Sequence, residues 1–166
     1  MSLVFSRPSR TPSKQKSEHN TSDASAHGVT LDVDALAGTY THPGYGTLTL
    51  CSPSSPSSYC AHVRSEFAVV DHEGDTGAVP DLLAAWPRFW TSHVRMRYRQ
   101  AGHHAFDVYF TSLFPNGYGK DQTPFEWTEF DVPYGTAEFV VEGGRVVGFW
   151  MRVEEAVGEE VWFESV

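Results

Sequence analysis

The segment TAEFVVEGGRVVGFWMRV, residues 136–153, constrains the fold more than any other part of the chain. Apolar residues alternate on both sides of Gly143 and Gly144, which can adopt the positive φ angles of a tight turn. A β-hairpin is therefore predicted, with Val141 opposite Val146 and Glu142 opposite Arg145. The two predicted faces are Ala137, Phe139, Val141, Val146 and Trp150 on one side, and Val140, Val147, Phe149 and Met151 on the other. Because both faces are apolar, we expect a sheet that is covered on both sides.

The segment WTSHVRMRYR, residues 90–99, predicts a second hairpin with the residues that follow it. A three-residue loop, 100–102, with Gly102 in the left-handed conformation brings all apolar residues to one face. The predicted pairs on this face are Tyr98 with His104, Met96 with Phe106, and Val94 with Val108. The opposite face pairs Arg97 with Ala105, Arg95 with Asp107, and His93 with Tyr109, which sets opposite charges across the ladder.

Shorter signals complete the predicted secondary structure. A helical turn capped by Thr30 or Asp32 should end near Leu36, and TLTLC and YCAHVRSEFAVV should pair as strands across the Ser/Pro loop between them. VPDLLAAWPRF can hold one helical turn before Pro87, and EEVWFESV should be a closing strand. About eight strands joined mainly by hairpins predict an all-β fold, an eight-stranded antiparallel barrel whose interior holds side chains or one small ligand.

Composition limits the domain count and the classes of partner. Residues 1–29 are almost entirely polar and predict a disordered tail, which leaves residues 30–166 for one β-barrel domain. A net charge of −9 argues against nucleic acid as a partner, and no apolar stretch is long enough to cross a membrane, so a cytoplasmic location is expected. Cys51 and Cys60 could form a disulfide across the loop between them or remain free thiols.

The stretch LFPNGYGKDQTPFE, residues 113–126, is rich in glycine, proline and aromatic residues. We expect Gly117 and Gly119 to let the backbone turn tightly, while Phe114, Tyr118 and Phe125 hold the loop across one end of the barrel. Such a loop is either a packed corner or a lid over a ligand.

Four stretches carry a family resemblance: LAGTYTHPGYGTLTL (36–50), FPNGYGKDQTPFE (114–126), AEFVVEGGRVVGFWM (137–151) and VWF (161–163). In this order they resemble the lipocalin-like C-terminal domain, a calycin-type barrel, of fungal β-lactamase-related serine hydrolases. The resemblance covers roughly residues 31–166 and implies an eight-stranded antiparallel barrel. The hydrolases of that family use Ser-x-x-Lys and Tyr-x-Asn motifs. Only SKQK (13–16) matches the first, within the polar tail, and nothing matches the second, so the resemblance implies an accessory domain without the hydrolase machinery.

Two polar groups are candidates for acid–base chemistry. His93, Arg95, Asp107 and Tyr109 share one face of the predicted hairpin, which points either into the barrel or to solvent. Glu126 belongs to an acidic group with Glu129, Asp131 and Glu138, in which two carboxylates in one apolar pocket would acquire different pKa values. The predicted catalytic residues are His93, Asp107 and Glu126.

Aromatic side chains are the candidates for ligand binding. A barrel lined by them would suit a small hydrophobic molecule oriented by a few polar groups. Alternatively, they fill the interior and leave no cavity. The predicted ligand-binding residues are Trp90, Arg95, Tyr98, Phe106, Tyr109, Phe125, Trp127 and Trp150. No metal site or cofactor is predicted, because the histidines are scattered and no zinc-like spacing occurs.

The resemblance, together with the aromatic side chains and the missing nucleophile motif, implies a non-catalytic, lipocalin-like barrel that binds a small hydrophobic molecule or packs against a serine hydrolase domain. The alternative is a cofactor-independent cyclase or isomerase of secondary metabolism that uses acid–base residues in the barrel cavity. Because one fold can host either role, the arrangement of the site has to decide between them.

Overall fold

The computed structural model describes residues 32–71, 81–99, 104–128, 132–153 and 160–166. The predicted tail, residues 1–29, and the predicted loop at 100–102 lie outside these ranges. The described helices and strands are α1 (Val33–Leu36), β1 (Gly38–His42), β2 (Gly46–Leu50), α2 (Ser58–Val70), β3 (Leu82–Ala85), β4 (His93–Tyr98), β5 (Ala105–Phe114), β6 (Phe125–Thr128), β7 (Gly135–Glu142), β8 (Arg145–Val153) and β9 (Glu160–Ser165).

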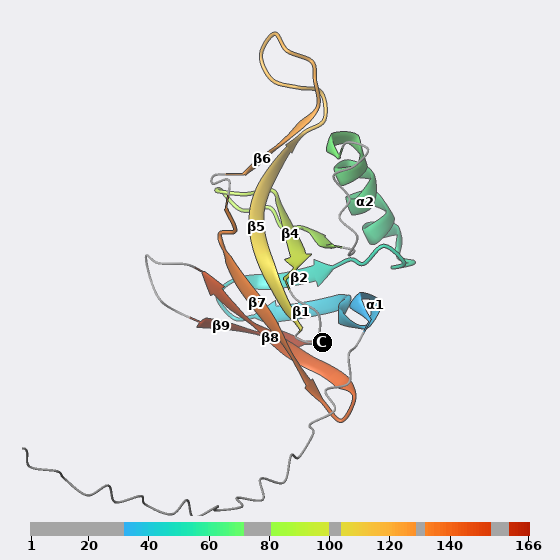
Figure 1. Ribbon diagram of the computed structural model, residues 1–166, viewed down its shortest axis with the longest axis vertical. Coiled ribbons are helices and arrows are strands. Elements are labelled where there is room, and N and C mark those ends of the chain that lie inside the picture. The colour runs from blue at the N-terminus through green and yellow to red at the C-terminus, as the bar shows by residue number, and fades with distance from the viewer. Residues whose placement is uncertain (1–31, 72–80, 100–103, 129–131, 154–159) are drawn as a thin grey trace, which may run out of the picture.

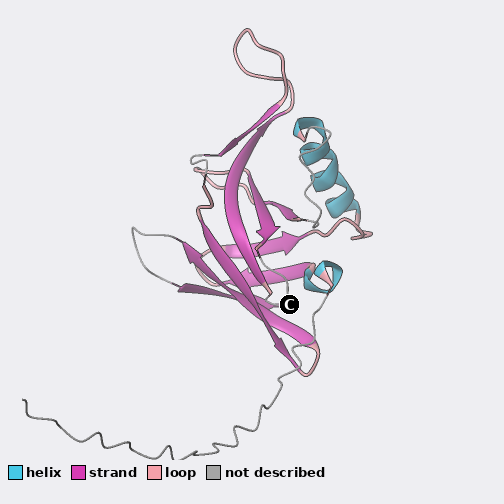
Figure 2. Cartoon of the chain, in the orientation of Figure 1, coloured by secondary structure: helices cyan, strands magenta, loops and turns pink. Residues whose placement is uncertain are grey.

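The strands form one antiparallel sheet in the order β2-β1-β9-β8-β7-β5-β4-β3, and β6 pairs with β5 off this path. Backbone hydrogen bonds run in both directions between Cys51, directly after β2, and Leu83 in β3. The sheet therefore curls into a nearly closed eight-stranded barrel (Figures 1 and 2). The predicted all-β antiparallel barrel is confirmed, as are the short helical turn before β1 and the closing strand, β9, which pairs with β1.

The barrel interior is packed with large side chains. Phe149 stacks on Phe163 with ring centroids 5.0 Å apart, and Tyr40 meets Phe149 edge-on at 5.0 Å. The Tyr40 hydroxyl donates a 2.7 Å hydrogen bond to the carbonyl of Leu36, and burial raises the pKa of this hydroxyl. Offset and edge-on ring pairs add stability beyond the area that they bury. Among the described residues, six aromatic side chains are buried in this core: Tyr40, Trp86, Phe106, Phe139, Phe149 and Phe163.

The prediction of a strand over YCAHVRSEFAVV is wrong, because these residues form most of α2. The Ser57 side chain caps the helix by accepting a hydrogen bond from the Cys60 N–H at 3.1 Å. Buried residues recur three or four positions apart, at Cys60, Val63, Phe67 and Val70, which is the period of a helix and not of a strand. The helix lies against the outside of the barrel (Figure 1).

The predicted helical turn in VPDLLAAWPRF is also wrong. Residues Leu82–Ala85 form β3, and their burial alternates so that Leu82 and Ala84 join the barrel core. Pairing with β4 on one side, and with the residue after β2 on the other, supplies the hydrogen bonds that a helical turn would have made internally.

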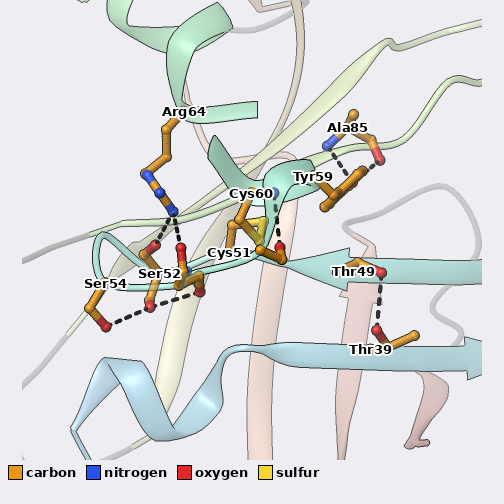
Figure 3. Close-up of a disulfide and its surroundings, with 11 residues drawn as sticks. Thr39, Thr49, Cys51, Ser52, Ser54, Tyr59, Cys60, Arg64 and Ala85 are labelled. Atoms are coloured by element: carbon orange, nitrogen blue, oxygen red, sulfur yellow. Dashed lines mark hydrogen bonds between the residues drawn. A yellow bond between two sulfur atoms is a disulfide. The ribbon is translucent and has the colours of Figure 1, made fainter. Parts of the chain in front are cut away.

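A disulfide between Cys51 and Cys60 ties the first turn of α2 to the closing seam of the barrel (Figure 3). Around it, Arg64 donates to the carbonyls of Ser52 and Ser55 at 3.1 and 2.9 Å. Cys51, Cys60, Val63 and Phe67 form a second, smaller apolar core between α2 and the sheet. Of the two sequence-based alternatives for these cysteines, the disulfide is therefore the one that forms.

The predicted β4–β5 register is wrong by two residues. Met96 pairs with Val108, Arg95 with Tyr109 and Arg97 with Asp107. Since a two-residue shift preserves the alternation of a strand, both predicted faces survive. The loop is longer than the predicted three residues, because the Arg99 N–H donates to the Ala105 carbonyl at 3.0 Å.

In the β7–β8 hairpin the two predicted pairs next to the turn are confirmed, but the predicted faces are wrong. A register shift between Val140 and Val141 makes Phe139 pair with Phe149 and Ala137 with Met151, so all four side chains face the core. Trp150 consequently points outward and is 43% exposed. The outer face of this hairpin is therefore not covered in the way that the sequence predicted.

The glycine-rich stretch forms the tip of the β5–β6 hairpin. Gly117 and Gly119 have φ angles of 73° and 65°, as the turn prediction required, and the rings of Phe114 and Phe125 stack at 4.7 Å. Tyr118 is 72% exposed, and the tip projects away from the barrel (Figure 1). The predicted packing of this loop across the end of the barrel is wrong.

Candidate functional site

The polar face of β4 points outward and is partly covered by α2. Val94 and Met96 lie in the barrel core, so His93, Arg95 and Arg97 occupy the opposite face. The Phe67 ring of α2 packs over this face, with the Arg95 guanidinium carbon 4.6 Å from its centroid. The sequence predicts that this face points either into the barrel or to solvent. In the structure it lies outside the barrel and is partly buried between β4 and α2.

Arg95 is at the centre of a charge cluster drawn from four segments. Its guanidinium donates to Glu126 of β6 at 3.1 and 2.7 Å, to Asp71 at the end of α2 at 2.6 and 3.5 Å, and to Asp81 before β3 at 3.2 Å. These five hydrogen bonds use all the donors that a guanidinium has. Arg95 is only 4% exposed, so its charge depends on these partners.

The cluster has more acidic than basic groups. Arg97, whose Nε is 3.7 Å from the Asp81 carboxylate, is the second cation, so two guanidiniums meet three carboxylates. Burial raises the pKa of Asp81 in spite of its hydrogen bond to Arg95. The fold therefore disfavours the charged form of Asp81 relative to the unfolded chain.

We expect the stability of an Asp81→Asn variant, relative to the wild-type chain, to improve as pH rises. Because the folded-state pKa is raised above the ordinary value of 3.8, the folded state binds this proton more tightly than the unfolded chain. The resulting stabilisation is complete below the ordinary pKa and is lost as pH rises through the raised one. Urea titrations of both proteins from about pH 3.5 to about pH 7 measure the difference. If the free energy of unfolding of the variant, minus that of the wild-type chain, stays constant or falls as pH rises, the pKa of Asp81 is not raised.

A pocket of about 260 Å³ lies beside this cluster. It is lined by Arg95, Arg97, Tyr109, Glu126 and Thr128, from β4, β5 and β6, and is called the Arg95 pocket below. Arg97 stacks over the Tyr109 ring at 5.3 Å, which orients the outer wall. Three predicted site residues, Arg95, Tyr109 and Glu126, are thus brought together, although on the outside of the barrel.

His93 takes part in a separate hydrogen-bonded chain. Its Nε2 lies 3.1 Å from the Glu66 carboxylate of α2, and its Nδ1 lies 2.7 Å from the Ser92 hydroxyl. His93 is buried under Phe67, whose ring is 5.3 Å away, and it does not line the Arg95 pocket. The carboxylate anchors the imidazole between helix and strand, which is a structural role.

Two other described candidates for acid–base chemistry, Asp107 and Glu138, do not line the Arg95 pocket. Asp107 forms a 3.6 Å ion pair with Arg99 instead of the predicted pair with Arg95. Glu138 is exposed on β7, and Glu129 and Asp131 lie outside the described residues. Of the predicted catalytic set, only Glu126 reaches the pocket.

The predicted aromatic residues do not line one cavity. Phe106 is fully buried in the barrel core, and Tyr98 packs against it at 5.3 Å. Trp90, Trp127 and Trp150 are 40–48% exposed at separate places, and Phe125 stacks in the β5–β6 hairpin. In the part of the chain that the structure describes, the inward-facing aromatic side chains fill space by packing on one another.

The sequence reasoning missed Asp71, Asp81, Arg97 and Thr128, all of which belong to the cluster or the pocket. Arg97 could have been found, because it shares the polar face of β4 with Arg95. The sequence could not place Asp71 and Glu66 near β4, because it predicts a strand where α2 forms. Asp81 carries no local signal, since its partner Arg95 is 14 positions away.

Among the described residues, no helix is long and apolar enough to span a bilayer, and no group of three or more His, Cys, Asp or Glu side chains could hold a metal ion.

No family model, curated protein or solved structure matches this chain.

Proposed function

We propose that this chain is a β-barrel protein that binds a small polar molecule in the Arg95 pocket. The observation that carries the proposal is a pocket whose inner wall is a buried guanidinium held by three carboxylates from separate segments. Side chains held in this way are ordered before a ligand arrives, which lowers the entropic cost of binding.

The groups that remain available define the ligand class. All Arg95 donors are used, whereas Arg97 Nη1 and Nη2 and the Tyr109 hydroxyl make no hydrogen bond within the described residues. The Glu126 carboxylate retains lone pairs that can accept hydrogen bonds. A suitable ligand therefore carries an anionic or strongly accepting group for Arg97 and a donor group for Glu126. The volume of about 260 Å³ is below the usual range of roughly 300–1,000 Å³ and indicates a small metabolite.

We expect Arg97→Gln to weaken binding of such a molecule about 10- to 100-fold, because a charged hydrogen bond is lost. Free amino acids are suitable zwitterionic probes, and their methyl esters and N-acetyl derivatives remove one charge at a time. Calorimetry measures affinity, and ¹H–¹⁵N correlation spectra locate the perturbed residues. Arg145→Gln serves as the control, because it removes the same charge at an exposed position next to the β7–β8 turn.

Saturable binding that perturbs Arg97, Tyr109 and Glu126 and is insensitive to Arg145→Gln supports the proposal. If no probe in the panel saturates, or if both substitutions weaken binding equally, the pocket is not the binding site.

An acid–base enzyme acting in the same pocket is a second candidate. The observation that favours it is the raised pKa of Asp81, which lies in hydrogen-bonding distance of Arg95 at the pocket wall. A carboxyl that holds its proton closer to neutral pH, near the ionic Glu126–Arg95 pair, provides an acid and a base in one place. Incubating a bound probe with stoichiometric protein and recording its NMR spectrum tests this candidate. An unchanged spectrum after many hours leaves binding as the function.

The other sequence-based expectations remain proposals. An apolar ligand at the barrel is favoured by one buried group, the indole N–H of Trp86, which has no hydrogen-bond partner among the described residues. A lipocalin-like accessory role beside a serine hydrolase rests on the sequence resemblance. Size-exclusion chromatography of the chain mixed with such a hydrolase domain tests it, and separate elution of the two argues against it.

A further inference from the structure

Aromatic side chains from four segments gather at one end of the barrel. The Trp86 ring, directly after β3, lies 5.8 Å from Phe110 of β5, 6.2 Å from Tyr45 in the β1–β2 turn and 6.3 Å from Phe163 of β9. These four residues are called the aromatic end. The Arg88 guanidinium lies 4.5 Å above the Trp86 ring and donates to the Tyr45 carbonyl, which ties the β3–β4 loop to the β1–β2 turn.

The indole N–H of Trp86 is a buried donor that has no acceptor in the described part of the chain. Trp86 is 2% exposed, and its Nε1 is the buried side-chain polar atom that finds no hydrogen-bond partner within the described ranges. The other buried polar side chains of the described chain, such as Thr91, His93 and Arg95, are hydrogen-bonded. Because an indole nitrogen can only donate, and an unpaired buried donor costs free energy, an added acceptor at this position would be stabilising as far as the described part of the chain shows.

Exposed aromatic side chains lie in the β1–β2 turn, next to the buried indole, and farther along the loop that follows it. The loop that begins at Trp86 carries Phe89, which is 96% exposed, and Trp90, whose ring meets Phe89 edge-on at 4.5 Å. Tyr45, a neighbour of Trp86, is 37% exposed. Tyr45 thus leaves the aromatic end partly open to solvent, and exposed apolar groups mark surfaces that bind apolar molecules.

We propose that the aromatic end binds a flat, apolar molecule whose oxygen acceptor takes the hydrogen bond of the Trp86 indole N–H. The rings of Tyr45, Phe110 and Phe163 supply apolar contact, and the single donor sets the orientation of the ligand. This inference rests on the proposed function, a barrel that binds small molecules, but it concerns a different site. The Arg95 pocket involves β4, β5 and β6 on the outside of the sheet, so the two sites can fail independently.

The probe is 6-propionyl-2-(dimethylamino)naphthalene, a flat fluorophore with a carbonyl acceptor. Its partner is 2-(dimethylamino)naphthalene, which lacks the carbonyl. We expect Trp86→Phe to weaken binding of the carbonyl probe about three- to tenfold, because one hydrogen bond is lost while an aromatic ring remains. The probe without a carbonyl should bind both proteins within about twofold, since it cannot accept the N–H. Trp127→Phe, at an exposed tryptophan of β6, is the matched control and should change neither affinity.

A direct readout uses the indole ¹H–¹⁵N signal of Trp86, assigned in the wild-type chain by its nuclear Overhauser contacts to the neighbouring rings of Phe110, Tyr45 and Phe163. The carbonyl probe should shift this signal of the wild-type chain, and the other probe should shift it less. This titration needs no variant to bind, so it decides the question even if Trp86→Phe folds poorly.

The inference is overturned if neither probe binds saturably, or if Trp86→Phe binds the carbonyl probe as tightly as the wild-type chain. It is also overturned if the indole proton shows a nuclear Overhauser contact to water and its signal does not move with the probe. Arg97→Gln separates the two sites. Loss of the carbonyl probe in that variant would assign the probe to the Arg95 pocket, which overturns the aromatic-end site and leaves the proposed function standing.

Discussion

Replacing Arg95 with methionine is expected to lower the free energy of unfolding by about 3–5 kcal/mol at pH 7, the usual cost of removing one partner from a buried ion pair. The variant would leave Asp71, Asp81 and Glu126 with about 20% of each side chain exposed and no central cation between them. Their mutual repulsion and the loss of five hydrogen bonds act in the same direction. Urea denaturation followed by circular dichroism measures the loss.

The pH dependence distinguishes this explanation from a simple packing defect. Without Arg95, Asp81 loses a hydrogen bond and a nearby positive charge that both lower its pKa, so the pKa of Asp81 should rise further. Lowering the pH through this value then stabilises the variant relative to the wild-type chain, and the difference should shrink between about pH 7 and about pH 4. Arg97→Met, at a half-exposed guanidinium of the same strand, is the control and should cost less than about 1 kcal/mol. A loss that is equal for both variants, or independent of pH, contradicts the role given to Arg95.

Removing the disulfide with the double substitution Cys51→Ser and Cys60→Ser is expected to cost about 2–3 kcal/mol, the value for a loop of this length in the chain-entropy model. The two cysteines are nine positions apart, and they join the first turn of α2 to the seam where β2 meets β3. Thermal or urea unfolding measures the cost. Adding a reductant to the wild-type chain should reproduce it, and adding reductant to the double variant should have no effect.

The loss should be concentrated at α2. Because the helix depends on the small core around Cys60, Val63 and Phe67, its amide protons should lose protection from exchange before those of the β7–β8 hairpin. The Arg95 pocket should change as well, since Asp71 at the end of α2 is one of its supports. Equal loss of protection in helix and hairpin would mean that the disulfide stabilises the whole barrel and does not specifically hold α2.

The hairpins show which parts of the fold follow from local sequence. Gly143 and Gly144 have φ angles of 56° and 80°, and the pairs next to this turn match the prediction. In β4–β5 the alternation gave the correct faces but not the register, because a shift by two residues leaves both faces unchanged. In β7–β8, the bulge puts Phe149 on the core face and Trp150 on the outer face, the reverse of the prediction. The local sequence does not show where a strand carries an extra residue, so the bulge could not be predicted.

The helix α2 shows how a local signal can be overlooked. Ser57 is a good capping residue, and apolar residues recur at helical spacing from Cys60 to Val70. β-branched and aromatic residues in the same segment also favour strands, so local propensity is compatible with either a helix or a strand. Packing against the barrel and the disulfide stabilise this segment as a helix.

The sequence by itself determined the all-β class, the turn-directed hairpins and the alternation that separates core from surface, because each depends on residues a few positions apart. Only the tertiary structure decided what those faces meet. It placed the polar face of β4 outside the barrel under α2, and it brought to Arg95 three carboxylates that are 14, 24 and 31 positions away. It also buried the Trp86 indole N–H with no acceptor among the residues that the structure describes. The physical reason is that burial and charge pairing depend on which segments come together in space, and a barrel brings together segments whose local sequences carry no information about one another.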